Sequence, residues 1–172
     1  HLAGVRVDDV LHRDAAEVLG LSLEEVAERL SRLTLPPGRM ETREVGGVVF
    51  VNDAYNANPA SMKAALQLLG EWTPARERVA VLGDMLELGR EAQQMHREVG
   101  RFAAGLQLSR LIVCGQLGRE IAAGARQEGM SQSAIVEVAD AASAADLLKK
   151  SVHRGDVVLV KASRAVGLEG FA

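Results

Sequence analysis

The sequence alternates short, wholly apolar runs with longer stretches in which apolar residues recur every three or four positions. The clearest runs are Val48–Val51, Val79–Leu82, Leu111–Cys114 and Val157–Val160. A strand in which every residue is apolar is buried on both faces, as in the parallel sheets of α/β proteins. The spacing between the runs is that of helices with one apolar face. The sequence therefore predicts an α/β fold in which helices flank a mostly parallel sheet.

The expected elements follow one another in regular order. An early strand or hairpin turns at Gly46-Gly47 and leads into the first buried strand, and a weaker strand is expected at Ala134–Val138. Asn58 and Pro59 are suited to the N-cap and first position of a helix. The expected helices are Ser61–Trp72, Glu91–Ala104, Leu117–Gln127 and Ala141–Val152, and the inward residues expected in the second of them are Ala92, Met95, Val99, Phe102 and Ala103.

A boundary is expected at Leu35–Gly38, where two prolines and a glycine stop any preceding helix. Residues 1–34 show two helical patterns, separated by Gly20. Ser22 and Glu25 have the spacing of a capping box at the start of the second helix. This short helical segment is too small to form a core alone, so we expect it to be the end of another domain.

Composition excludes several classes of protein. The chain has 172 residues, is 48% hydrophobic and carries a net charge of −3, so disorder is not expected. The 20 Lys and Arg are outnumbered by 23 Asp and Glu, which argues against a nucleic-acid surface. The single cysteine excludes a disulfide scaffold. No apolar run approaches about 18 residues and the first residues do not resemble a secretory signal, so we expect no membrane span and a cytoplasmic location.

Polar side chains follow several of the expected strands directly. The segments concerned are Asn52–Pro59, Gly83–Gly89 and Lys161–Arg164. In open parallel sheets, ligands bind outside the carboxyl ends of the strands. Because these segments contain carboxylates, amides and cations together, the sequence predicts a ligand with charges of both signs or many hydroxyl groups.

The first of these segments has the densest set of polar side chains. A carboxylate such as Asp53 can accept hydrogen bonds from ribose hydroxyls, and the amides of Asn56 and Asn58 can donate and accept. The alternative is an ordinary turn with a helix cap, because Asn and Asp favour both. We favour the cap for Asn58 and a binding role for Asp53 and Asn56, since one cap does not need so many polar residues.

The other two segments offer charges of opposite sign. Lys161 and Arg164 suit a carboxylate or a phosphate, with a solvated loop as the alternative. Asp84 and Glu87 are candidates for holding an amine, although Glu87 is equally suited to the start of the following helix.

The sequence lacks the motifs of several catalytic sites. It has no glycine-rich P-loop, no dinucleotide-binding fingerprint and no nucleophile elbow. His96 lies within an expected helix and is interpreted as a packed residue, and Cys114 as a small buried one. No catalytic residue and no metal ligand is therefore expected in this chain.

Four segments together resemble the C-terminal domain of the Mur ligases: Pro37–Met40, Asn52–Pro59, Val81–Gly89 with His96, and Leu159–Arg164. The resemblance covers roughly residues 35–172. It implies a Rossmann-like domain, preceded in residues 1–34 by the end of the family's central domain. That central domain carries the P-loop and most of the Mg²⁺ ligands, so the resemblance implies that this chain alone is inactive.

The four segments together resemble most closely the branch of the family that adds D-alanyl-D-alanine to UDP-MurNAc-tripeptide in peptidoglycan synthesis, and the Tyr-Asn-Ala-Asn-Pro sequence favours the cell-wall enzymes of the family. Such an enzyme uses ATP to form an acyl phosphate, which the amine of the dipeptide then attacks. Its partners are these substrates and the rest of the same polypeptide. The alternatives are a ligase similar to folylpolyglutamate synthase and a non-catalytic α/β ligand-binding module.

The resemblance also implies roles for individual residues. Arg39 reaches the ATP phosphates, Asp53 binds the ribose, and Asn56 or Asn58 lines the nucleotide cleft. The residues implied for the dipeptide site are Asp84, Glu87, Lys161, Ser163 and Arg164.

Overall fold

The computed structural model describes residues 38–167 together with Gly20, Ser22 and Glu25. The helical segment expected in residues 1–34 otherwise lies outside the described residues. Its capping box is confirmed, because the Ser22 N–H donates to Glu25 Oε2 at 2.9 Å and the Glu25 N–H donates to Ser22 Oγ at 3.2 Å.

The described part of the chain contains one six-stranded sheet, with the strand order β1-β2-β6-β3-β4-β5. β1 and β2 form an antiparallel hairpin, and every other neighbouring pair is parallel. This arrangement confirms the expected mostly parallel sheet. The strands are β1 Glu41–Val45, β2 Val48–Asn52, β3 Arg78–Leu82, β4 Arg110–Cys114, β5 Ile135–Val138 and β6 Val157–Lys161.

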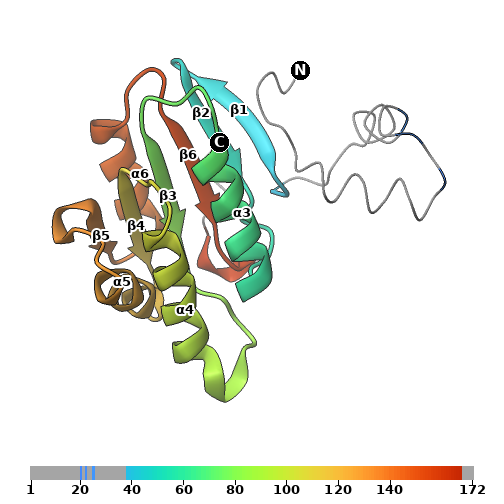
Figure 1. The fold of residues 1–172 in the computed structure, drawn as a ribbon. Helices are drawn as coiled ribbons and strands as arrows, with labels where there is room; N and C mark the ends of the chain where they lie inside the picture. The colour runs from blue at the N-terminus through green and yellow to red at the C-terminus, as the bar shows by residue number, and fades with distance from the viewer. Residues whose placement is uncertain (1–19, 21, 23–24, 26–37, 168–172) are drawn as a thin grey trace.

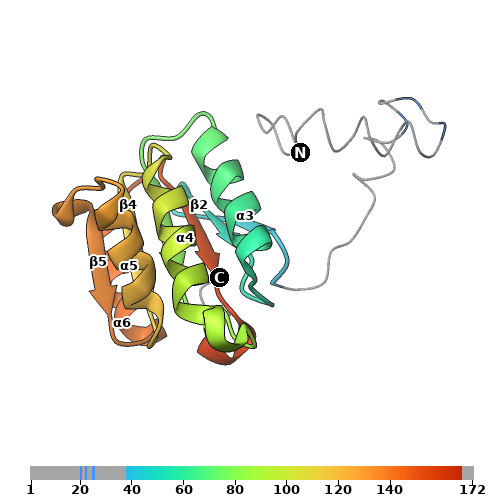
Figure 2. The same cartoon turned by 60° about the horizontal axis from the view of Figure 1, so that its bottom comes forward.

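Helices cover both faces of the sheet. α3, α4 and α5 lie side by side on one face, as Figures 1 and 2 show, and α6 packs against the other. Their bounds are α3 Pro59–Glu71, α4 Ala92–Ala104, α5 Gly118–Gln127 and α6 Ala141–Ser151, with short 3-10 helices at Gly89–Glu91, Gln132–Ala134 and Arg164–Val166. None of the helices in the described ranges is long and apolar enough to cross a bilayer.

The apolar strands divide their side chains between two core clusters. In β3, Ala80 and Leu82 pack in the cluster on the α3–α5 side, and Val79 and Val81 pack in the cluster beneath α6. Because both sets are buried, these strands show no polar alternation in the sequence. Each fully buried Val or Leu contributes about 1.5–3 kcal/mol, so both faces contribute to stability.

Local sequence accounts for the hairpin and for the start of α3. Gly46 and Gly47 have φ values of 62° and 82°, which suit a tight turn between antiparallel strands. The side chain of Asn58 accepts from the Ser61 N–H at 2.8 Å, and Ser61 Oγ accepts from the Asn58 N–H at 3.1 Å. Asn58 is therefore the N-cap, as expected, and Pro59 occupies the first turn.

The inward face of α4 differs from the expected one. Val99 and Ala103 are buried as predicted, whereas the fully buried positions also include His96 and Gly100. Gly100 lies against α5, where a Cβ atom would come within 1.9 Å of the Ile121 carbonyl oxygen. The two helix backbones approach too closely at Gly100 for a larger side chain. The other residues of the expected face, Ala92, Met95 and Phe102, are half-buried.

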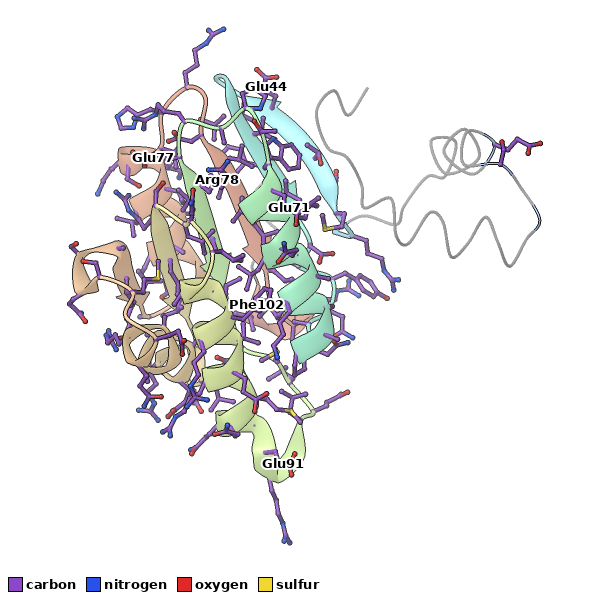
Figure 3. The ribbon with its side chains drawn as sticks, viewed as in Figure 1. Glu44, Glu71, Glu77, Arg78, Glu91 and Phe102 are labelled. Atoms are coloured by element: carbon purple, nitrogen blue, oxygen red, sulfur yellow. The ribbon has the colours of Figure 1, made fainter. Side chains whose placement is uncertain are left out.

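The parallel strands all point toward one end of the molecule. The loop that leads into α4 extends from this end, and Glu91 marks it in Figure 3. Glu44 and Glu77 mark the opposite end, where the parallel strands begin. The polar segments that follow β2, β3 and β6 therefore meet at one edge of the sheet, as predicted.

Candidate functional site

A polar cavity of about 220 Å³ lies where β2 and β6 end and α3 begins. All four residues predicted for the nucleotide contribute to its wall. The lining residues are Arg39, Asp53, Tyr55, Asn56, Asn58, Ser61 and Lys161.

Lys161, which the family resemblance assigns to the dipeptide, also lines this cavity. Only 1% of the residue is exposed. Its ammonium donates to Asp53 Oδ2 at 2.5 Å and to the carbonyl oxygen of Asn56 at 3.1 Å. Burying a charged group is costly unless it is paired and hydrogen-bonded, as it is here. Lys161 therefore fixes the loop that follows β2 against the end of β6.

The second oxygen of Asp53 holds the turn that carries Arg39. Oδ1 accepts from the Met40 N–H at 3.2 Å, and the Tyr55 N–H donates to the Gly38 carbonyl at 3.0 Å. Gly38 has a φ of 72°, a conformation that glycine adopts at little cost. The side chain of Asp53 is 15% exposed, so its carboxylate stays accessible from the cavity.

The two asparagines combine structural bonds with a place on the cavity wall. Asn56 Oδ1 accepts from the Ala57 N–H at 2.8 Å, and Asn58 Oδ1 is the cap acceptor of α3. Their side-chain NH₂ groups make no hydrogen bond among the described residues. The N-terminus of α3 adds its partial positive charge to this side of the cavity.

Two arginines lie near the ring of Tyr55, which lines the cavity. The guanidinium carbon of Arg39 lies over the ring, 4.4 Å from its centroid, and that of Arg164 lies 5.9 Å from it. Tyr55 is 41% exposed. No role for Tyr55 was predicted from the sequence, although its position between Asp53 and Asn56 could have indicated one.

The segment after β3 makes contacts that the sequence did not predict. The carboxylate of Asp84 accepts from the Gln116 and Leu117 N–H groups, at 3.0 and 2.9 Å, just before α5. Ser163 Oγ accepts from the Leu86 N–H at 2.9 Å. Asp84 and Ser163 thus hold this segment in place, and whether they also contact a substrate stays a prediction.

Glu87 is exposed and has a φ of 63°. It forms no helix cap, because the 3-10 helix and α4 that follow have no side-chain cap bond. Its carboxylate has no partner among the described residues, so of the two carboxylates predicted for an amine, Glu87 is the accessible one.

His96 and Cys114 are packed residues, as expected. Nδ1 of His96 donates to the Ala92 carbonyl at 2.6 Å, and Nε2 accepts from the Met85 N–H at 2.9 Å. The ring therefore ties α4 to the segment after β3. Burial raises the pKa of the Cys114 thiol to about 11, with smaller contributions from Asp84 and Asp140, so this thiol is not a nucleophile at neutral pH.

Comparison with known proteins identifies the family. Residues 38–164 match the family described as "Mur ligase, glutamate ligase domain". The UDP-N-acetylmuramoyl-tripeptide–D-alanyl-D-alanine ligase of Mycobacterium leprae is 44% identical over an alignment of 172 positions, gaps included, that covers 89% of this chain and 33% of that protein. The chain thus spans about a third of the length of the curated relatives it matches.

Solved structures agree with this match. MurF from Acinetobacter baumannii has a TM-score of 0.72 and 29% identity, covering 91% of this chain and 33% of that one. MurF from Thermotoga maritima in complex with ADP has a TM-score of 0.69 and 30% identity, with 91% and 34% covered. A folylpolyglutamate synthase/dihydrofolate synthase from Yersinia pestis shares the fold at 16% identity and a TM-score of 0.56, over 87% of this chain and 33% of that one.

The sheet order, the cavity at its carboxyl edge and the match over residues 38–164 lead to one conclusion: this chain belongs to the Mur ligase family, through that family's glutamate ligase domain.

Proposed function

We propose that this chain is the C-terminal part of an ATP-dependent ligase that adds D-alanyl-D-alanine to UDP-MurNAc-tripeptide in the bacterial cytoplasm. The cavity after β2 and β6 is the observation that carries the proposal, because it gathers every residue that the family resemblance assigns to the nucleotide. The names of the 44% identical relative and of the MurF structures support the choice of substrates.

The cavity has the chemistry that a nucleotide requires. A guanidinium, an ammonium and the N-terminus of α3 give it positive character suited to phosphates. The accessible carboxylate of Asp53 can accept hydrogen bonds from ribose hydroxyls, because each of its oxygens retains a free lone pair. In the proposed reaction ATP supplies the phosphoryl group that activates the tripeptide carboxylate, and residues of this chain bind and orient ATP.

The second half of the site, formed by Glu87, Ser163 and Arg164, suits a zwitterionic dipeptide. The exposed guanidinium of Arg164 can bind the carboxylate of D-alanyl-D-alanine with two parallel hydrogen bonds. Glu87 offers the accessible negative charge for the amine. Asp84 supports this half through its bonds to the start of α5.

The proposal assigns the catalytic centre to the rest of the polypeptide. Among the described residues, no three His, Cys, Asp or Glu side chains lie close enough together to hold a metal ion. In line with the family resemblance, we propose that the Mg²⁺ accompanying ATP is bound mainly by the central domain. Residues 1–34 are proposed to be the end of that domain, and residues 35–172 the domain that closes over the nucleotide.

The first test is the substitution Asp53→Ala in the complete ligase. We expect the apparent KM for ATP to rise roughly 10- to 150-fold, because a hydrogen bond to a charged group contributes about 1.5–3 kcal/mol. The KM for the dipeptide should change much less. Steady-state kinetics with each substrate varied in turn measures both values.

Two further variants control this experiment. Asp53→Asn keeps the shape of the side chain and limits the disturbance of Lys161, which Asp53→Ala leaves without its carboxylate partner. Glu44→Ala removes an exposed carboxylate at the opposite end of the molecule and should leave both KM values unchanged. A normal ATP KM in correctly folded Asp53 variants would remove Asp53 from the nucleotide site.

The substrate itself separates the proposal from the related ligases. The complete enzyme should form product from UDP-MurNAc-tripeptide, D-alanyl-D-alanine and ATP, with stoichiometric release of phosphate. Product from a folate and glutamate in place of these substrates would favour the folylpolyglutamate synthase-like alternative.

A further inference from the structure

Tyr55 stands between the two halves of the proposed site. Its ring has the Arg39 guanidinium over it at 4.4 Å and the Arg164 guanidinium at 5.9 Å, measured from the guanidinium carbons to the ring centroid. Arg39 precedes β1 and Arg164 follows β6, so the two cations come from opposite ends of the domain sequence. One aromatic ring thus contacts the cation proposed for ATP and the cation proposed for the dipeptide.

The backbone that carries the ring is held in place by its neighbours. The Tyr55 N–H donates to the Gly38 carbonyl at 3.0 Å, in the turn that also carries Arg39. On either side, Lys161 binds the carboxylate of Asp53 and the carbonyl of Asn56. The backbone around Tyr55 is therefore anchored at three points, although 41% of the residue as a whole is exposed.

An exposed aromatic ring in this position has a specific electrostatic effect. The face of the ring is negative and attracts cations, which offsets part of the repulsion between two nearby guanidinium groups. Long arginine side chains lose considerable rotamer freedom when they bind an anion. A ring that restrains both side chains beforehand reduces the entropy lost on binding.

We propose that Tyr55 is a positioning residue shared by both substrates: its ring holds Arg39 in place for the ATP phosphates and Arg164 in place for the carboxylate of D-alanyl-D-alanine. This inference rests on the proposed function and deepens it. Tyr55 acts through the two arginines, so its effect is on substrate binding rather than on the chemical step.

Kinetics of the complete ligase test the proposal through two substitutions at one position. Tyr55→Leu keeps an apolar side chain but removes the ring, and it should raise the KM for ATP and the KM for the dipeptide about two- to fivefold each, the effect of one exposed cation–π contact. The kcat should stay nearly constant. Tyr55→Phe keeps the ring and should return both KM values to those of the unaltered enzyme.

A double-substitution cycle gives a second readout. Arg39→Met should raise the KM for ATP by a smaller factor in the Tyr55→Leu background than in the unaltered enzyme, because the two residues act as a unit. Arg164→Met should likewise raise the KM for the dipeptide by a smaller factor in the Tyr55→Leu background. Val45→Thr, at an exposed apolar position on β1, is the matched control for surface changes.

The kinetic outcomes that overturn the proposal are distinct. A rise in only one KM removes the shared role, and unchanged values in Tyr55→Leu remove the role altogether. An equal loss of kcat and thermal stability in Tyr55→Leu and Tyr55→Phe would show that Tyr55 has only a structural role.

A measurement that does not depend on activity separates this inference from the proposed function. Tyr55 is the only tyrosine of the 172-residue chain, so its ring gives the only tyrosine signals in the NMR spectrum of this chain. Arg39→Met and Arg164→Met should each shift these signals, and the absence of a shift in either variant contradicts the proposal. If the complete, unaltered enzyme does not use the dipeptide, the proposed function fails, and the NMR result still decides whether the ring holds both cations.

Discussion

Lys161 and Arg164 carry the same charge three positions apart, yet their surroundings give them different roles. The ammonium of Lys161 is buried against Asp53 and the Asn56 carbonyl, where a compact point charge fits. Arg164 is exposed at the start of a 3-10 helix, with its guanidinium over Tyr55. A planar guanidinium can contact a ring on its face and a carboxylate at its edge, which an ammonium cannot do.

This difference predicts the effect of Arg164→Lys, a substitution that conserves charge. We expect kcat/KM for the dipeptide to fall roughly 5- to 150-fold, equivalent to about 1–3 kcal/mol, because the paired hydrogen bonds to the carboxylate are lost. The KM for ATP should barely change. Arg43→Lys, on the exposed face of β1, is the control.

Steady-state kinetics of the complete enzyme distinguishes the possible results for Arg164→Lys. Impaired ATP binding with normal use of the dipeptide would mean that the two halves of the site are reversed. No effect on either substrate would mean that the segment after β6 is an ordinary solvated loop.

At the scale of elements, α4 and α5 pack so closely that their contact leaves no room for a Cβ atom at Gly100 or Gly124. A Cβ atom at Gly124 would come within 2.0 Å of the Arg97 carbonyl oxygen, and one at Gly100 within 1.9 Å of the Ile121 carbonyl oxygen. Both obstacles are backbone atoms, which cannot rotate away. Close packing here brings α4 into the position from which His96 reaches the segment after β3.

We therefore expect Gly124→Ala to lower the free energy of unfolding by about 1–3 kcal/mol, the usual cost of overpacking. Gly70→Ala in α3 is the matched control, because its nearest neighbour would be the flexible side chain of Leu106 at 3.2 Å. There the better helix propensity of alanine should offset the contact or stabilise the protein by up to about 1 kcal/mol. Urea unfolding measures both changes, and an equal loss in the two variants would contradict the packing argument.

At the scale of the whole molecule, the two ends of the sheet carry different kinds of charged groups. The carboxyl end carries the accessible charges of the proposed site, and the opposite end carries an ion pair between the buried Asp156 and the half-exposed Arg76. There Arg76 Nε donates to Asp156 Oδ1 at 2.8 Å, and the His153 N–H donates to Oδ2 at 2.7 Å. Asp156 is fully buried, and the pair fixes the start of β6 at the end distant from the cavity.

This ion pair predicts how stability depends on pH. Burial alone raises the pKa of Asp156, but the hydrogen bonds from Arg76 and from the His153 backbone outweigh it, and the net pKa is below the ordinary value of 3.8. A carboxyl group with a lowered pKa stabilises the folded state above its unfolded pKa, and this stabilisation is lost as pH falls through the folded pKa. The free energy of unfolding should therefore decrease as the pH falls below about 4.

Unfolding experiments across this acid range test the assignment to Asp156. Asp156→Asn should make the decrease shallower, whereas Asp146→Asn, at an exposed carboxylate, should not. Some dependence should remain in Asp156→Asn, because hydrogen bonding from Arg43 also lowers the pKa of Glu41, and hydrogen bonding from Ser143 lowers that of Asp140. An unchanged acid profile in Asp156→Asn would rule out the ion pair as its cause.

A further expectation concerns the 172-residue chain as a unit. It should neither hydrolyse ATP nor form a peptide bond, because the sequence contains no P-loop to bind the phosphates. Phosphate release by the purified chain, compared with that of the complete ligase, provides the measurement. Turnover above background in a preparation free of other ATPases would contradict this expectation.

The sequence by itself determined the local structure and the motifs of the described domain. The apolar runs predicted the strands, because the spacing of apolar residues along the sequence indicates the type of secondary structure. The Gly46-Gly47 turn and the Asn58 cap were also predictable, since each depends on residues within a few positions. The segment Asn52–Pro59 likewise identified most of the cavity wall before the fold was known.

The tertiary structure alone decided which of these local pieces meet. Lys161 and Asp53 are 108 positions apart, and their ion pair forms only because β6 lies directly beside β2 in the sheet. Asp84 binds the start of α5 because β3 and β4 are neighbours, and His96 of α4 accepts a hydrogen bond from Met85 in the segment after β3. Such contacts depend on strand order and helix packing, which are set by the burial of the whole core rather than by neighbouring residues.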